Sequence, residues 1–495
     1  MRDPIEERAP KLERSGQELF DVLVIGGGIV GAGIARDAQM RGLRTLLVEQ
    51  GDFASGTSSR SSRLLHGGLR YLAQGSIGLV REASREKMLL AHLAPHLCQP
   101  LPFIFPVWRD GPWPLWKLVA GVHLYDLLCG RRNFGRSSAF SAARLAAEVP
   151  GLRREGLAGG VRYFDALTND ARLVIDTLRS AESSGALLLN YTTLLRCDRG
   201  AGEWRAGLRD EVSGEVIEAR ARTVVNAGGP WADRFPHSRV RLRLTKGAHL
   251  VIDRARLPVP EALVLPERDR ILFVIPWGER VILGTTDTDY EGDPAEVCTS
   301  AADVEYILRV VNEALPDLRL TPADLISTWA GVRPLIAPRR SAAGTPSDIS
   351  RGHQITVGEN GWIDVAGGKL TTYRLMAEQA VDRLGRWLGT RLPGSRTAGL
   401  PIVGPADERH KIGVLPPPVS RDVVSRCCRA EWVVHLDDLL LRRTSWHFYH
   451  PAASGVSETA CEWMAEELGW DSRRRAAEWR RLEKGVRRIF WPGRR

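Results

Sequence analysis

The sequence lacks a hydrophobic run that is long and uncharged enough to cross a bilayer. Its apolar stretch at residues 113–129 is interrupted by Lys117, His123 and Asp126, whereas a membrane-spanning helix needs about 20 predominantly apolar residues. Residues 1–19 are polar and carry charges of both signs, without the apolar segment of a secretory signal. We therefore expect neither a spanning helix nor a signal peptide. We interpret the apolar stretch as a buried core helix rather than a helix on a membrane surface.

Cysteine is also scarce. The seven cysteines are scattered, odd in number and without a C-x-x-C pair, which argues against a disulfide framework or a metal site and favours a reducing cytoplasm. The basic residues lack the interleaved aromatic residues of nucleic-acid-binding surfaces, so no nucleic acid partner is expected. The net charge of +10 suits an anionic substrate or an acidic membrane surface, unless it reflects only an arginine-rich composition.

The most informative segment is the glycine turn within residues 20–31. An apolar run predicts a strand, and a helical pattern begins directly after the glycines. Gly26 allows the tight turn, Gly28 lets a pyrophosphate approach the backbone, and Gly31 lets the helix pack closely on the strand. The helix N-terminus favours phosphates. A second apolar run ends at Glu49, where a carboxylate can hold ribose hydroxyls. The pattern predicts a dinucleotide site, without separating FAD from NAD.

Two further segments predict a site close to this turn. The Ser/Gly-rich residues 55–71 end in His-Gly-Gly-Leu-Arg-Tyr, which combines small glycines with cationic and phenolic donors, so we predict a site loop rather than a linker. Residues 362–373 repeat the strand, Gly-Gly, helix arrangement and place Lys369 at the helix start. A helix N-terminus and a cation stabilise the negative charge of a reduced flavin. The alternative is an ordinary turn with a solvated lysine.

The remaining patterns divide the chain. Residues 223–231 predict a strand that returns to the nucleotide-binding domain and stops at glycines. The strand-like segments 249–252, 271–277 and 281–285 are separated by short turns, which predicts an antiparallel sheet. After Arg391 the chain becomes proline-rich and then helical, which predicts a small separate module.

Motifs in order along residues 20–388 resemble those of one flavoprotein family. They are VIGGGIVGAGIA (24–35), TSS (57–59), HGGLRYL (66–72), DARL (170–173), VNAGGPW (225–231), KGAH (246–249), FVIPW (273–277), GTTD (284–287), GVRPL (331–335) and GGKLTTYR (367–374). The family is the FAD-dependent, quinone-linked glycerol-3-phosphate dehydrogenases, related to D-amino-acid oxidase-like flavoproteins. The motifs GGKLTTY and HGGLRY are far more specific than the glycine turn. A weaker match, LDDLLLRRT, lies at 436–444.

The resemblance implies an α/β fold with a Rossmann-like FAD-binding domain, an interleaved antiparallel-sheet substrate domain and a small, shortened C-terminal helical module. Arg63 stands where a lysine is common in the family. The resemblance implies one FAD-dependent oxidoreductase region at 20–391 and a C-terminal helical domain at 392–495. Within the first region, the FAD-binding segments are at about 20–98, 170–232 and 355–391, and the substrate-domain segments are at about 99–169 and 233–354.

The resemblance also implies an activity. The family oxidises sn-glycerol 3-phosphate to dihydroxyacetone phosphate, with hydride transfer from C2 to flavin N5 and electrons passed to a membrane quinone. The resemblance therefore implies a cytoplasmic protein that binds peripherally to the anionic inner face of the cell membrane. It also allows a homodimer. Two alternatives stay open. One is a flavin oxidase that uses oxygen on glycerol phosphate or on another 2-hydroxy acid or amine, and the other is a non-catalytic flavin-binding paralogue.

The implied site combines cations with one histidine. The resemblance gives catalytic roles to His249, Arg333 and Lys369, and substrate contacts to Arg70, Tyr71 and Arg351. His249 is the candidate base because a neutral imidazole accepts protons near pH 7. A core histidine and a structural Arg333 ion pair remain alternatives. The implied cofactor contacts are Ile25, Gly26, Gly28, Gly31, Glu49, Thr57, Ser58, Ser59, His66, Gly67, Gly68, Ala227, Gly228, Trp231, Gly368, Lys369, Leu370 and Thr371.

Overall fold

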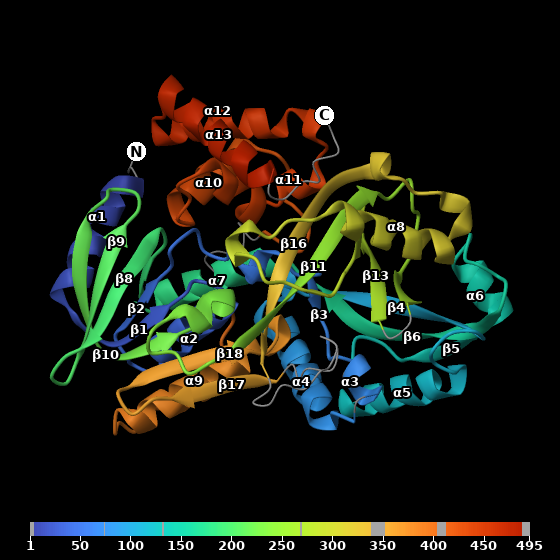
Figure 1. Cartoon of the computed structure of the whole chain (residues 1–495), viewed down its shortest axis with the longest axis horizontal. Helices are drawn as coiled ribbons and strands as arrows, with labels where there is room; N and C mark the ends of the chain where they lie inside the picture. The colour runs from blue at the N-terminus through green and yellow to red at the C-terminus, as the bar shows by residue number, and fades with distance from the viewer. Residues whose placement is uncertain are drawn as a thin grey trace.

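The structure is a computed structural model that describes residues 4–73, 75–130, 133–267, 270–337, 352–402 and 412–487. It contains two large sheets at opposite ends of the molecule and a helical C-terminal module that lies against their junction (Figure 1). The predicted α/β class, with one nucleotide-binding type of sheet and one mostly antiparallel sheet, is confirmed.

The first sheet has eight strands, and its five central strands run parallel. These are, in spatial order, β18 (Trp362–Gly367), β10 (Val216–Asn226), β1 (Leu19–Ile25), β2 (Thr45–Val48) and β7 (Leu187–Leu189). Three antiparallel strands are added: β17 (His353–Val357) pairs with β18, β9 (Trp204–Asp210) pairs with β10, and β8 (Thr192–Arg199) pairs with β9.

Both faces of this sheet are covered, which explains why its central strands are continuous apolar runs. The helices α2 (Ile29–Met40), α7 (Asp170–Ser183) and α9 (Tyr373–Trp387) pack on one face. On the other face lie α1 (Pro4–Gln17) and the β8–β9 hairpin. The carboxyl ends of β1, β2, β10 and β18 therefore meet at one edge, where ligands bind in open α/β sheets.

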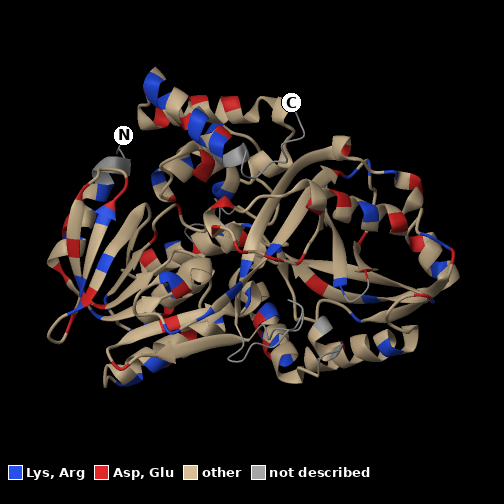
Figure 2. Cartoon of the chain, in the orientation of Figure 1, with Lys and Arg blue, Asp and Glu red and all other residues tan. Residues whose placement is uncertain are grey.

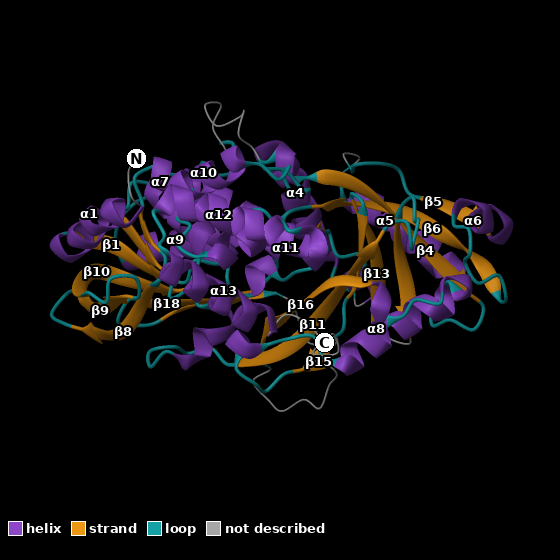
Figure 3. Cartoon of the chain, turned by 90° about the horizontal axis from the view of Figure 1, so that it is seen from above, coloured by secondary structure: helices purple, strands orange, loops and turns teal. Residues whose placement is uncertain are grey.

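The second sheet has ten strands, mostly antiparallel. They are β3 (Leu64–Leu65), β4 (Gln99–Trp108), β5 (Ser138–Ser141), β6 (Leu157–Leu167), β11 (Leu242–Asp253), β12 (Ala262–Glu267), β13 (Arg270–Trp277), β14 (Arg280–Gly284), β15 (Thr288–Asp289) and β16 (Leu325–Ile336). One apolar core joins it to α6 (Ala142–Glu148) and α8 (Ala301–Ala314). A second core joins it to α4 (Ile77–Leu93) and α5 (Leu115–Leu128). Seen from above, this sheet lies apart from the helix-covered first sheet (Figure 3).

The helix α5 corrects one prediction. Residues 113–129 were expected to form a buried core helix, yet only Val122 and Tyr125 of α5 are buried. Trp116 is 73% exposed and Leu127 is 68% exposed. The prediction was wrong because composition alone does not say which side of an apolar helix has a partner. In the described part of the chain, no helix is long and apolar enough to cross a membrane.

The C-terminal module is helical, as expected, and it packs against the first domain through buried polar contacts. It contains α10 (Arg421–Ala430), a π-helical turn (Asp438–Arg443), α11 (Trp446–Tyr449), α12 (Val456–Leu468) and α13 (Ser472–Arg487). The π-helical turn reaches Asp52 in the loop after β2. Arg443 donates two hydrogen bonds of 2.7 Å to the Asp52 carboxylate, and Arg442 pairs with the same group.

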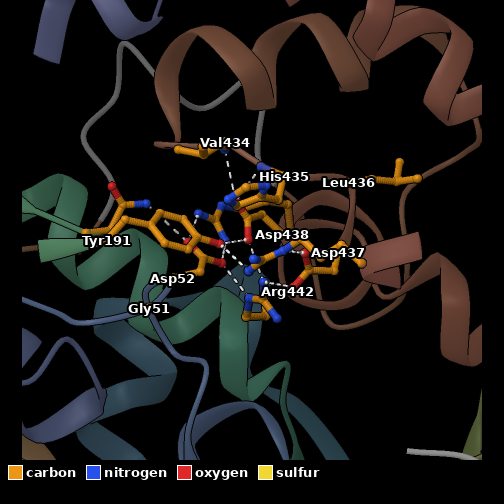
Figure 4. Close-up of polar contacts among 12 residues, drawn as sticks. Gly51, Asp52, Tyr191, Val434, His435, Leu436, Asp437, Asp438 and Arg442 are labelled. Carbon is orange, nitrogen blue, oxygen red and sulfur yellow. Dashed lines mark hydrogen bonds and ion pairs between the residues drawn. The ribbon is translucent and has the colours of Figure 1, made fainter. Parts of the chain in front are cut away.

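Further buried polar contacts extend this junction, as the close-up in Figure 4 shows. The Tyr191 hydroxyl, from the turn before β8, donates to Asp438 at 2.5 Å. Arg442 also binds Asp438 and Asp437. The adjacent guanidiniums hold the pKa of Asp52 below its usual value, although burial acts in the opposite direction. The module is thereby fastened to the loop that follows Glu49.

Candidate active site

The glycine turn forms one wall of a cavity of about 520 Å³ at the carboxyl edge of the first sheet. Gly26 has a φ of +108°, and a Cβ there would lie 2.5 Å from the carbonyl oxygen of Ala227. A Cβ on Gly31 would lie 1.9 Å from the carbonyl oxygen of Gly26. These two positions therefore require glycine for the tight turn and the close helix contact. Gly28, the residue before α2, lines the cavity itself.

Glu49 lies at the end of β2 and lines the same cavity. Its carboxylate accepts hydrogen bonds from the backbone N–H of Gly27 at 2.7 Å and of Gly51 at 3.0 Å. Burial raises the pKa of Glu49, while these two bonds act against the rise. The carboxylate is therefore held at the cavity wall by backbone donors on both sides of the loop.

The Ser/Gly loop lies across the start of α2. The Ser58 hydroxyl accepts from the backbone N–H of Ile29 at 3.0 Å, which satisfies a donor that Gly28 cannot cap with a side chain. The Thr57 hydroxyl donates to the carbonyl of Val332 on β16 at 2.7 Å. This loop therefore connects the helix of the first sheet to a strand of the second.

A second cavity, of about 510 Å³, continues from the first. The two share lining residues Ile29, Thr57, Ser58, Pro334, Gly368, Lys369 and Leu370. The space thus extends from Glu49, past the start of α2, to Lys369. An elongated dinucleotide fits this arrangement, with its phosphates beside Gly28 and the α2 N-terminus. The residues present therefore fit FAD.

Arg333, on β16, lines the second cavity, and its side chain is held by polar neighbours. Its guanidinium pairs with Asp287 at 3.1 Å and donates to the Thr285 hydroxyl at 3.1 Å. Its side chain remains 24% exposed. The structural ion pair that the sequence left open is therefore present, and the same side chain still faces the cavity.

His249, on β11, also lines this cavity although it is only 1% exposed. Its Nε2 shares a 2.8 Å hydrogen bond with the Ser62 hydroxyl, and its ring stacks on Trp329 with 5.2 Å between ring centres. Burial, followed by the positive charges of Arg333 and Arg63, lowers the pKa of His249 to about 3. The imidazole is therefore neutral at physiological pH.

Lys369 joins the two specific motifs. It precedes the 3-10 turn at Leu370–Thr372 that leads into α9, and its Nζ lies 3.7 Å from the centre of the Tyr71 ring. The Thr371 hydroxyl accepts from the backbone N–H of His66 at 3.2 Å. The HGGLRY and GGKLTT segments are thus in direct contact, 305 positions apart in the chain.

Gly67 is held by a buried polar cluster. Its backbone N–H donates to the Tyr125 hydroxyl of α5 at 3.0 Å and to Asp165 of β6 at 3.2 Å. Lys87 of α4 donates to the same Asp165 oxygen at 2.9 Å. Burial, followed by the Asp165 charge, holds the pKa of Tyr125 well above its usual value, so its hydroxyl stays protonated. The active-site loop is therefore anchored to the surface helix α5.

The structure brings most of the expected residues to the two cavities. Gly31, Ser59 and Gly67 line neither cavity. Arg351 lies outside the described residues, and of Arg70 only the backbone is described, at the start of α3 (Arg70–Ala73). The residues that line a cavity are Ile25, Gly26, Gly28, Glu49, Thr57, Ser58, His66, Gly68, Tyr71, Ala227, Gly228, Trp231, His249, Arg333, Gly368, Lys369, Leu370 and Thr371.

Four residues of the site were missed from the sequence. Ser62 holds His249, Trp329 stacks on it, and Asp287 braces Arg333. Arg60 lines the second cavity, and desolvation lowers its pKa to about 10. Ser62 and Arg60 belong to the predicted site loop, which was the available signal. Nothing local distinguishes Trp329.

Comparisons with known proteins agree with this geometry. The family model "FAD dependent oxidoreductase" matches residues 21–374, and "C-terminal domain of alpha-glycerophosphate oxidase" matches residues 402–475. The chain is 42% identical over 411 residues to glycerol-3-phosphate dehydrogenase 2 of Mycobacterium tuberculosis, covering 80% of this chain and 68% of the relative. It is 40% identical over 380 residues to the aerobic glycerol-3-phosphate dehydrogenase of Staphylococcus haemolyticus, covering 75% and 68%.

A solved structure extends the likeness over the whole chain. The glycerol-3-phosphate dehydrogenase from Bacillus halodurans, complexed with FAD, superimposes with a TM-score of 0.79 at 29% identity, covering 100% of both chains. A glycine oxidase from Geobacillus kaustophilus shares the fold over 80% of this chain, with a TM-score of 0.59 at 20% identity. The chain therefore belongs to the FAD-dependent glycerol-3-phosphate dehydrogenase family of flavoproteins, and FAD is its cofactor.

Proposed function

We propose that the protein oxidises sn-glycerol 3-phosphate to dihydroxyacetone phosphate and passes the electrons to a membrane quinone. The observation that carries this proposal is the second cavity, in which Arg333, Lys369 and a neutral His249 converge beside the cofactor cradle. The flavin, when bound, supplies the acceptor for the hydride from substrate C2. The protein must supply charge for the substrate phosphate, a base for its hydroxyl proton, and a fixed orientation.

The cation count favours a phosphate over a carboxylate substrate. Arg333, Lys369 and Arg60 all line the second cavity, and Asp287 pairs with Arg333. A carboxylate needs about one bidentate arginine, whereas a phosphate dianion is best held by several donors. Arg70 and Arg351 stay proposed contacts on the strength of the resemblance.

His249 is proposed as the base for the C2 hydroxyl. Its Nε2 is hydrogen-bonded to Ser62, which also lines the cavity. The substrate proton can reach Nε2 directly or through the Ser62 hydroxyl. A bound phosphate dianion counteracts the two arginines that lower the imidazole pKa, so binding raises the basicity of His249 when the proton must be removed.

A second region supports the proposed membrane and quinone partners. The exposed side of α5 carries Trp116, Leu124 and Leu127, at 73%, 39% and 68% exposure, and Figure 2 shows this helix with few charged positions. Leu124 also lines the catalytic cavity, together with Phe105 and other apolar residues. Apolar contacts therefore run from the proposed site to an apolar surface, as peripheral association with the inner face of the cell membrane requires.

Anaerobic spectroscopy tests this function. FAD-loaded protein is mixed with sn-glycerol 3-phosphate, and the flavin absorbance is followed before and after a quinone analogue is added. We expect prompt bleaching, recovery with the quinone and slow recovery in air. Fast recovery in air would make the protein an oxidase. A flavin spectrum that glycerol phosphate does not change would contradict the proposed activity and favour the non-catalytic paralogue.

A further inference from the structure

Arg63 is buried directly behind the catalytic cavity, next to the Ser62 that holds His249. Its side chain is 1% exposed. Its guanidinium carbon lies 4.5 Å from the centre of the Trp277 ring, 5.4 Å from that of Trp329 and 5.9 Å from that of Phe448. The positive charge therefore lies in an aromatic cage built from β13, β16 and α11.

Arg63 has no ion-pair partner among the described residues, although the charge of Asp170 acts on it from beyond ion-pair distance. No described carboxylate lies within 4.0 Å of the Arg63 guanidinium, whose Nη2 donates to the Ser445 hydroxyl at 3.1 Å. Its Nε and Nη1 are buried without a hydrogen-bond partner. Burying a charge without a paired group is unfavourable. Stability alone therefore does not explain why a charged side chain occupies this place.

Arg63 is instead connected to every group that fixes His249. Trp329 lies between them, because its ring contacts the Arg63 guanidinium and stacks on the imidazole with 19° between planes. The Arg63 backbone N–H donates to the Ser61 hydroxyl at 3.0 Å, and Trp329 Nε1 donates to the Ser61 carbonyl at 3.1 Å. The backbone at Arg63 has a φ of +56°, a conformation that is uncommon for residues other than glycine.

We propose that Arg63 is a positioning residue for the reaction. Its caged side chain, which has no described ion pair, holds Ser62 and Trp329 against His249 and links the base to the C-terminal module through Ser445 and Phe448. This inference rests on the proposed role of His249 as base. It adds a second function for the C-terminal module besides its contact with the loop after Glu49.

The charges around His249 determine whether its pKa rises or falls when Arg63 is removed. Two cations act on it, Arg333 from its own sheet and Arg63 from the site loop. The neighbouring strand β14 faces the ring with Gly284, which has no side chain. Both cations disfavour the imidazolium, so removing Arg63 raises the pKa of His249. Replacing it with another cation preserves the pKa.

The test compares R63M with R63K in the FAD-loaded, full-length protein. Methionine keeps the apolar stem without the charge, and lysine keeps the charge without the planar group. We expect kcat to fall in R63M and to be largely kept in R63K, with an unchanged KM for glycerol phosphate in both. The substrate phosphate titrates at pH ~6, above the His249 pKa of about 3, so the pH profile of kcat/KM follows the substrate and the His249 pKa is measured separately.

Two further measurements make the result decisive. NMR titration of the His249 ring in the same variants reports its pKa without turnover, so it tests the inference even if glycerol phosphate is not the substrate. An unchanged His249 pKa in R63M would overturn the inference. If R63M does not fold, F448L serves instead, because it opens the cage from the C-terminal side. It should lower kcat without changing KM or FAD content, and an unchanged kcat would overturn the link to the module.

Discussion

Arginine side chains are buried in two different ways in this molecule. At the C-terminal junction, Arg442, Arg443 and Arg481 face Asp52, Asp437 and Asp438, so that positive and negative groups match. Around the second cavity, Arg60, Arg333 and Lys369 instead line a space that is open to a ligand, and Arg333 pairs with Asp287.

The two arrangements of charge serve different purposes: one holds parts of the chain together, and the other is available to a ligand. Matched buried charges attract each other strongly and leave little net potential, so they hold two parts of a chain in one arrangement. Cations that line a cavity remain accessible to an anionic ligand. We therefore expect the first cluster to contribute to stability and the second to bind the proposed substrate. Variants that remove one charge from each should separate the two properties.

The largest effect is expected at the matched cluster. Asp52→Asn leaves Arg442 and Arg443 buried without their shared carboxylate, which should lower the free energy of unfolding by about 3–5 kcal/mol. Thermal unfolding monitored by circular dichroism measures the change. Asp289→Asn, which removes an exposed carboxylate paired with Arg243, is the matched control and should leave Tm unchanged. Equal Tm shifts in both variants would contradict the fastening role.

Among the cations that line the cavity, Arg333→Ala should affect catalysis instead of stability. We expect kcat/KM for glycerol phosphate to fall on the order of 10³-fold, because a partly desolvated anion loses a charged partner. FAD content and Tm should stay near those of the unaltered protein. Stopped-flow reduction of the flavin measures the rate, and absorbance spectra measure the FAD content. Arg243→Ala, on the exposed side of the same sheet, is the control. Loss of FAD from Arg333→Ala would instead show a structural role.

The pH dependence of stability should include a contribution from Asp52 and Asp437 of the matched cluster, against which Asp438 acts because burial raises its pKa. The pKa values of Asp52 and Asp437 are depressed in the folded state by their arginines. Their stabilisation is therefore complete above the unfolded carboxyl pKa of about 3.9 and is lost as the pH falls below it. We expect Tm to be flat between pH 7 and 5 and to fall steeply below about 4. Asp52→Asn should flatten that fall, and an equally steep fall in the variant would refute the assignment.

The smallest effect is expected at α5, where apolar contact rather than charge is proposed. Trp116→Ser should weaken binding to anionic lipid vesicles by roughly tenfold, with unchanged reduction by glycerol phosphate. Val216→Ser, at a 61% exposed apolar position on β10, is the matched control. High salt should release part of the bound protein if exposed cations also contribute. Vesicle binding that Trp116→Ser leaves unaltered would remove α5 from the proposed membrane surface.

The sequence predicted those parts of the site whose conformation depends on residues next to each other in the chain. The turns at Gly26 and Lys369 follow from a strand that ends at small residues before a helix, and both lie where expected. The support of His249 could not be predicted in this way. Ser62 and Trp329 lie far from His249 in the chain and meet it only through strand pairing and a loop crossing. The exposure of α5 likewise depends on which surfaces it packs against.

The loop at residues 57–66 has little freedom to change in length. Most loops tolerate insertions because few of their atoms have fixed partners. This one meets α2, β16, α7, β11, the C-terminal module and the turn before α9 within ten residues. Those contacts come from Ser58, Thr57, Ser61, Ser62, Arg63 and His66, in that order. One extra residue would displace every later partner. The segment therefore has a fixed length, and it is the least suitable place in the chain for a tag or an insertion.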